Sequence, residues 1–182
     1  MLTISMTKNQ IKNKVYDCIT FYQANMLFQL RFEILKDVVD YFVICEANKS
    51  HTGLKKEFNF NPKIPKKYQD KIIYIKVTDL PDIKIKGKKD YKLLSLQMEN
   101  LFKGIRSASQ NDLIIFSDED EIPNPNIINS FNYKKYKFGI FLQNMYYYKL
   151  NIMNIDEGNG NWAGSRICQK KNLKSFFKLR LL

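Results

Sequence analysis

The chain has 182 residues and a formal net charge of +12, from 30 Lys and Arg against 18 Asp and Glu. Its hydrophobic content of 45% and aromatic content of 14% exclude an intrinsically disordered chain. The longest apolar runs are far shorter than the roughly 18 residues of a membrane span, so we expect a soluble protein.

The length is typical of one domain around one hydrophobic core. Residues 1–14 carry only isolated apolar residues and no small-residue cleavage site, so we expect a flexible tail followed by a single domain over 15–182. The three cysteines form no CxxC pair, which predicts reduced thiols and a cytoplasmic protein. With a single histidine, a Cys/His zinc site is disfavoured, so any metal should be held by oxygen.

The chain opens with alternating strand and helix patterns. β-Branched and aromatic residues over 15–22 predict a strand. Apolar residues spaced by three or four over 24–39 then predict a helix. The continuous apolar run at 41–45 is typical of a strand that is covered on both faces.

The next segment is rich in turn-forming residues. Glycine and prolines over 48–65 predict a loop, with an edge strand around Phe58 and Phe60. Residues 71–77 predict a third strand, and the lysine-rich stretch 81–90 predicts a loop.

The clearest helical pattern is at 91–108, and it is followed by a buried strand at 113–116. Strands that alternate with helices indicate an α/β fold with a mostly parallel central sheet and helices on both faces. Ligands of such sheets bind beyond the carboxyl ends of the strands. We therefore expect the functional site at that edge.

The remaining pattern is weaker. Residues 138–142 and 145–150 predict two strands that form a hairpin around Gln143 and Asn144. A turn is expected at 162–164, and the basic end of the chain predicts either a helix or a strand.

An acidic run follows the fourth predicted strand. In extended backbone Asp118 and Asp120 point to the same side, so their carboxylates face one point in space. Their mutual repulsion favours a compensating hard cation, Mn²⁺ or Mg²⁺, which takes one or two carboxylates and fills its other positions with water and substrate phosphates. The spacing predicts a metal that bridges the protein to a diphosphate; the alternative is a solvated acidic turn.

The acidic run belongs to a longer recognisable segment. Residues 112–123, Asp-Leu-Ile-Ile-Phe-Ser-Asp-Glu-Asp-Glu-Ile-Pro, resemble a signature of glycosyltransferase family 17, the family of bisecting N-acetylglucosaminyltransferases. Residues 15–35 are similar to the family's opening strand and helix, and 37–53 to its Val-Asp-x-Phe-Val-Ile-x-Glu block. Residues 97–100 are similar to the helix before the acidic motif. The segments also occur in the family's order.

The resemblance implies an inverting transferase of the GT-A type, with UDP-N-acetylglucosamine as donor and a divalent metal. When the family's motif is transferred to the matching positions, Asp118 and Asp120 are the metal motif, and Asp118 is also expected near the nucleotide. The other donor-binding candidates are Thr20, Phe21, Glu46, Asn48, His51, Asn100 and Arg106.

The catalytic base is less well specified. An inverting transfer needs a base to take the proton of the acceptor hydroxyl. Asp156 and Glu157 form the acidic pair downstream of the metal motif and are candidates by elimination, and Glu121 is a further catalytic candidate within the motif. Trp162 either stacks on a sugar ring or anchors a loop. The family domain extends further than this sequence, so we expect the acceptor site to be incomplete.

Two other functions remain open. The chain could be a nucleotide-sugar-binding protein without catalysis, or a basic nucleic-acid-binding module that uses its lysine clusters and aromatic residues. The second is less favoured, because the cations are mostly Lys, and it leaves the acidic motif unexplained. For an enzyme, the expected partners are the nucleotide-sugar donor and a glycan acceptor, with possible peripheral contact between the lysine patches and an anionic membrane.

Overall fold

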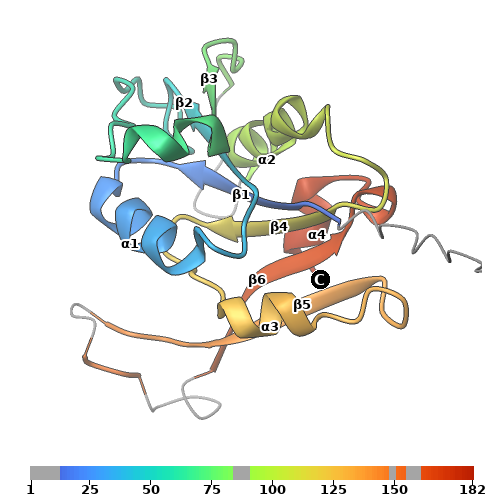
Figure 1. Ribbon diagram of the computed structural model, residues 1–182. Helices are drawn as coiled ribbons and strands as arrows, with labels where there is room; N and C mark the ends of the chain where they lie inside the picture. Colours follow the sequence, from blue (N-terminus) through green and yellow to red (C-terminus); the bar gives the residue numbers. More distant parts are fainter. Residues whose placement is uncertain (1–12, 84–90, 148–150, 155–160) are drawn as a thin grey trace, which may run out of the picture.

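The computed structural model describes residues 13–83, 91–147, 151–154 and 161–182. Its centre is a six-stranded sheet with the order β3-β2-β1-β4-β6-β5 (Figure 1). The strands are β1 (Val15–Phe21), β2 (Tyr41–Ala47), β3 (Ile72–Val77), β4 (Leu113–Asp118), β5 (Phe138–Asn144) and β6 (Asn161–Gln169).

The predicted α/β class is confirmed, and the sheet is mixed. Strands β1 to β4 pair in parallel, whereas β6 runs antiparallel to β4 and β5 runs antiparallel to β6. Strand β4 is therefore the place where parallel pairing changes to antiparallel pairing.

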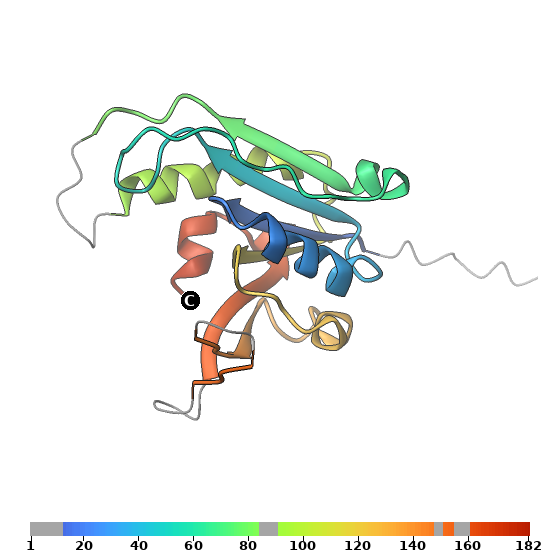
Figure 2. The ribbon, with the colours of Figure 1, turned by 90° about the vertical axis from the view of Figure 1, so that its left-hand side faces the viewer.

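Helices cover both faces of the sheet, as expected (Figure 2). On one face lie α1 (Asn25–Leu35) and α3 (Pro125–Ser130). On the other face lie α2 (Lys92–Glu99), its continuation η2 (Asn100–Ile105) and α4 (Phe176–Arg180). Two short 3₁₀ helices, η1 (Lys66–Lys71) and η4 (Lys170–Asn172), complete the described structure.

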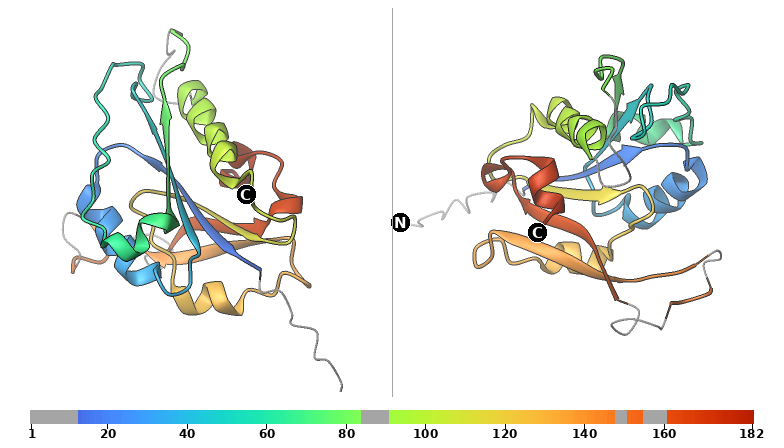
Figure 3. Two further views of the ribbon diagram at one scale, coloured as in Figure 1. Left: turned by 45° about the horizontal axis from the view of Figure 1, so that its top comes forward. Right: turned by 180° about the vertical axis from the view of Figure 1, so that it is seen from behind.

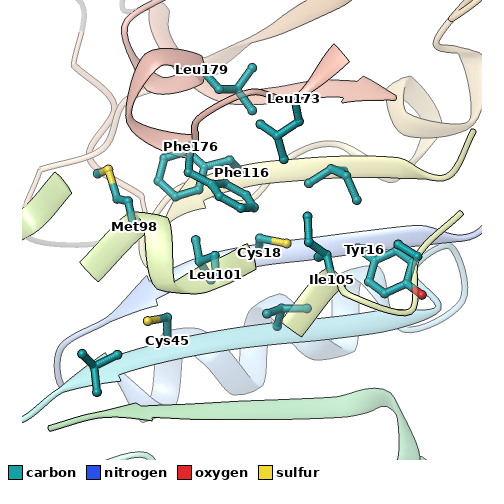
Figure 4. Close-up of a cluster of buried hydrophobic side chains, with 14 of the residues drawn as sticks. Tyr16, Cys18, Cys45, Met98, Leu101, Ile105, Phe116, Leu173, Phe176 and Leu179 are labelled. Atoms are coloured by element: carbon teal, nitrogen blue, oxygen red, sulfur yellow. The ribbon is translucent and has the colours of Figure 1, made fainter. Parts of the chain in front are cut away.

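Each face has its own hydrophobic cluster, because successive side chains of a strand point to opposite faces. Cys18 and Phe116 pack under α2, η2 and α4 together with Phe176 (Figure 4). Ile19 and Phe28 belong to the cluster under α1. Burial on both sides explains why β1 and β2 read as nearly continuous apolar runs.

Two sequence predictions on the first half need correction. The edge strand at Phe58 and Phe60 is wrong: the backbone N–H groups of Asn59 and Phe60 donate to the Glu46 carboxylate, at 2.8 and 3.1 Å, instead of pairing with a strand. The predicted helix over 91–108 is α-helical only to Glu99 and then continues as the 3₁₀ helix η2.

The second half of the chain differs more from the prediction. There is no hairpin turn at Gln143 and Asn144, because β5 continues through both residues and pairs with β6. The turn at 162–164 is also wrong: Trp162 opposes Gln143 in the β5–β6 ladder. Part of the predicted strand 145–150 lies outside the described residues, and Tyr146 forms an isolated bridge with Met153.

Helix α3 was not expected from the sequence. The Asn124 side chain caps it by accepting a hydrogen bond from the Asn126 N–H, and Pro125 occupies its first turn. The basic end of the chain forms both a strand, β6, and a helix, α4. None of the helices in the described part of the chain is long and apolar enough to cross a membrane.

Candidate functional site

The carboxyl ends of β1, β2 and β4 meet at one edge of the sheet. Thr20 is the register partner of Asp118, and Phe21 is the register partner of Glu46. Glu119, which follows Asp118, accepts hydrogen bonds from the backbone N–H groups of Tyr22 and Ala24 at 3.0 and 3.3 Å. The loop after β1 is thereby tied to the acidic run.

The two carboxylates of the predicted metal motif have different surroundings. The Asp118 side chain is 37% exposed, and its Oδ2 lies 2.8 Å from Arg180 Nη2. Burial raises the pKa of Asp118, because the opposing effect of Arg180 is smaller. Asp120 is exposed and forms no hydrogen bond or ion pair with any described residue. Its carboxylate is thus available to a ligand.

Glu121 is buried beneath the motif. Its Oε1 accepts hydrogen bonds from Arg180 Nη2 at 2.9 Å and from Trp162 Nε1 at 2.6 Å. Its Oε2 accepts one from the Asp118 backbone N–H at 3.2 Å. Both carboxylate oxygens are engaged by protein donors, an arrangement that suits a positioning residue better than a base.

Arg31 of α1 supports the motif from the other face of the sheet. Its fully buried guanidinium binds both carboxylate oxygens of Asp17 at 2.6 Å and the Ser117 hydroxyl at 2.8 Å. It also donates to the Glu121 carbonyl at 2.7 Å. This role of Arg31 was not predicted from the sequence, although a cation in the middle of an amphipathic helix is a signal for a buried partner.

Arg180 and Trp162 reach the motif from the far end of the sequence. Helix α4 lies against the same face of the sheet as α2 (Figure 3). Arg180 is the last residue of α4, and its guanidinium carbon lies 5.9 Å from the centre of the Trp162 ring. The sequence around Arg180 does not predict this contact.

A pocket opens beside the motif, between the end of β1 and the loop after β2. Thr20, Phe21 and His51, three of the donor-binding candidates, contribute to its walls. The remaining lining residues are Tyr22, Ala47, Lys49, Ser50, Lys56, Leu94 and Gln97. Gln97 was not among the predicted site residues, and its Nε2 donates to the Cys45 carbonyl at 2.9 Å.

Glu46 lies below this pocket and is fully buried. It accepts hydrogen bonds from the Tyr74 hydroxyl at 2.6 Å and from the backbone of Asn59 and Phe60, and it forms an ion pair with Lys56. Burial, followed by the Glu46 carboxylate, raises the pKa of Tyr74 well above its usual value. Glu46 therefore holds the loop that carries Lys56 into the pocket.

The other donor-binding candidates are dispersed. Asn48 follows β2, and its Oδ1 is buried without a hydrogen-bond partner in the described part of the chain. Asn100 begins η2 and donates to the Leu96 carbonyl at 2.9 Å. Arg106 lies at the opposite edge of the sheet, where its carbonyl accepts a hydrogen bond from Lys170, and the structure does not bring it to Asp118.

The base candidates Asp156 and Glu157 lie outside the described residues. Among the described residues, no three His, Cys, Asp or Glu side chains are grouped as a metal site. The expected extended backbone over 118–120 is wrong, because β4 ends at Asp118 and the chain then turns, with the Glu121 N–H donating to the Asp118 carbonyl at 3.2 Å. The two carboxylates nevertheless fit Mg²⁺ or Mn²⁺, because these ions accept one or two carboxylates and leave other positions to substrate phosphates and water.

Comparison with known proteins gives the same family as the resemblance of the acidic motif. The profile of glycosyltransferase family 17 matches residues 4–164, which include the pocket and the acidic run. No curated protein matches the chain. The chain belongs to glycosyltransferase family 17.

Proposed function

We propose that the protein transfers N-acetylglucosamine from UDP-N-acetylglucosamine to a glycan acceptor with the help of Mn²⁺ or Mg²⁺. One observation carries this proposal. The exposed carboxylate of Asp120 stands next to Asp118 at the end of β4, and the register partner of Asp118, Thr20, lines a pocket. Family membership supports sugar transfer, and the pocket offers a place for the nucleotide.

Asp118 and Asp120 would hold the metal through carboxylate oxygens. When bound, the ion stabilises the negative charge of the departing diphosphate. The pocket residues Lys49, Ser50 and His51 supply donors for the polar groups of the nucleotide, and Phe21 supplies an apolar wall. Trp162 donates to Glu121 beneath the motif, and its half-exposed ring suits a sugar.

In an inverting transfer the acceptor hydroxyl attacks the anomeric carbon while a base takes its proton. Glu121 is engaged by Arg180 and Trp162, so Asp156 and Glu157 stay our candidates for that base. A fold of the GT-A type is part of the proposal.

Calorimetric titration of UDP, with and without Mn²⁺, tests the donor site. We expect binding that needs Mn²⁺ in the native chain and is lost in Asp120→Ala. The matched control is Asp37→Ala, which removes another exposed carboxylate, located between α1 and β2. Metal-independent binding, or equal binding by Asp120→Ala, would contradict the proposal. If UDP binds with Mn²⁺ but incubation with UDP-N-acetylglucosamine gives neither hydrolysis nor transfer of the sugar, a non-catalytic nucleotide-sugar-binding protein is favoured.

A further inference from the structure

We propose that Arg180 binds the diphosphate of the donor, so that α4 supplies a cationic side chain of the donor site. The inference rests on the proposed function and adds a residue that lies outside the span matched by the family profile, 4–164.

The guanidinium of Arg180 is placed beside the motif by directed hydrogen bonds. Nη2 donates to Asp118 Oδ2 at 2.8 Å and to Glu121 Oε1 at 2.9 Å, and Nη1 donates to the Gly164 carbonyl at 3.2 Å. Because a guanidinium has five N–H donors, Nε and one hydrogen of Nη1 have no partner among the described residues. Those groups are free to bind an anion.

The position of this guanidinium is set by a well-anchored helix. Phe176 is fully buried, and Leu179 is 3% exposed. The Ser175 hydroxyl caps α4 by accepting a hydrogen bond from the Lys178 N–H, and it donates to Glu99 Oε1 at 2.6 Å. Arg180 is therefore preorganised, which lowers the entropy lost when it binds a ligand.

A second guanidinium adds positive charge at the same place. Arg166 and Arg180 both donate to the Gly164 carbonyl. Arg166 is 6% exposed, and its Nε is buried without a hydrogen-bond partner in the described part of the chain. Burial, and next the nearby Arg180, lowers the pKa of Arg166. Arg166 thus adds a positive charge next to the ion pairs that Arg180 forms with Asp118 and Glu121.

The charge of the leaving group fits this arrangement. Cleavage of the sugar–phosphate bond leaves a nucleoside diphosphate that carries more negative charge than the intact donor and more than one divalent ion neutralises. Asp118 has one oxygen bound to Arg180, so its other oxygen can contact a metal without displacing the guanidinium. A diphosphate bound to that metal would lie beside Arg180, whose planar group is well suited to phosphate oxygens.

The test compares Arg180→Gln with Lys178→Gln, which removes the same charge from an exposed position on the same helix. Binding of UDP and of uridine is measured by calorimetry in the presence of Mn²⁺. For Arg180→Gln we expect about ten- to a hundredfold weaker binding of UDP, as for a lost charge-assisted hydrogen bond, and nearly unchanged binding of uridine. Arg180→Lys should recover part of the loss, and Lys178→Gln should behave like the native chain.

Three results would overturn the inference. If Arg180→Gln binds UDP as tightly as the native chain does, Arg180 does not contact the diphosphate, and the proposed function still stands. Equal loss of UDP and uridine binding, with a lowered melting temperature and no recovery in Arg180→Lys, would make Arg180 purely structural. Failure of the native chain to bind UDP would remove the proposed function together with the inference.

Discussion

Arg31 Nε lies 2.6 Å from Asp17 Oδ2, and neither side chain is exposed to solvent. Replacing Arg31 by Met would leave the Asp17 carboxylate buried without its cation. We therefore expect Arg31→Met to lower the free energy of unfolding by about 3–5 kcal/mol. Urea denaturation followed by circular dichroism measures this change.

The surface pair of Lys36 with Glu33 is the control for this experiment. The Glu33 side chain is 56% exposed, so the pair is screened by water. We expect Glu33→Gln to change the free energy of unfolding by less than about 0.5 kcal/mol. A similar small effect of Arg31→Met would show that the buried pair does not stabilise the fold.

Trp162 should report metal binding. It is the single tryptophan of the chain, and its Nε1 donates to Glu121, which also bonds the Asp118 N–H. A paramagnetic ion at Asp118 and Asp120 would lie close to the indole. We expect Mn²⁺ to quench the tryptophan fluorescence of the native chain and to leave Asp120→Ala unchanged.

Mg²⁺ serves as the control ion for this titration, since it is diamagnetic and should quench much less. Quenching of equal size in Asp120→Ala would place the ion elsewhere.

The cysteines predict a loss of stability at high pH. Burial raises the pKa of Cys45 and of Cys168 to about 12 and raises the pKa of Cys18 well above its usual value. The folded state thus favours the neutral thiols. Their contribution is complete below the unfolded pKa, about 8.5, and falls as the pH rises towards the folded values. Urea denaturation at a series of pH values should show this decline.

Thiol labelling gives an independent check on the same cysteines. At pH 8 we expect an aromatic disulfide reagent to label all three cysteines in urea and none in the folded protein. Rapid labelling of the folded protein would contradict the burial of these thiols.

Gly104 permits the close packing of η2 on the sheet. A Cβ at this position would overlap Val43 Cγ1 and lie 3.0 Å from Ile75 Cδ1. We expect Gly104→Ala to lower the free energy of unfolding by about 1–3 kcal/mol through overpacking. Lys103→Ala, at the exposed neighbouring position, is the control and should stay close to the native value in the same urea denaturation.

The β/α half of the fold was predictable because its signals are local. The apolar runs and the helix spacing before Asp118 predict β1, α1, β2, β3 and β4 to within a few residues. The location of Thr20 and Asp118 at one edge also follows, since the carboxyl ends of parallel strands meet there.

The prediction failed where a side chain from another part of the sequence determines the local backbone structure. Phe58 and Phe60 alternate as in a strand, yet the buried Glu46 takes the N–H groups that a strand would use. At Asn124 and Pro125, residues typical of a break between elements form the capped start of α3. The same residue types occur at the start of a helix and at a break between elements, and only tertiary packing distinguishes the two.

The most consequential missed contact is that of Arg180 with Asp118. The two residues are 62 positions apart in the sequence, and no periodicity or short motif relates them. Their contact depends on the β5–β6 ladder, whose register the sequence did not reveal. Charge alone could not identify Arg180 among the 30 basic residues.

The change of pairing at β4 has a consequence for how the protein is made. Strands β1 to β4 and helix α1 are complete once residue 118 has left the ribosome, so the parallel part of the sheet can fold during synthesis. At that moment Asp118 has neither β6 nor α4 beside it. The site thus acquires both Trp162 and Arg180 only after another 62 residues have been added. A nascent chain that stalls in this interval would carry the pocket with its lysines but without Arg166 and Arg180.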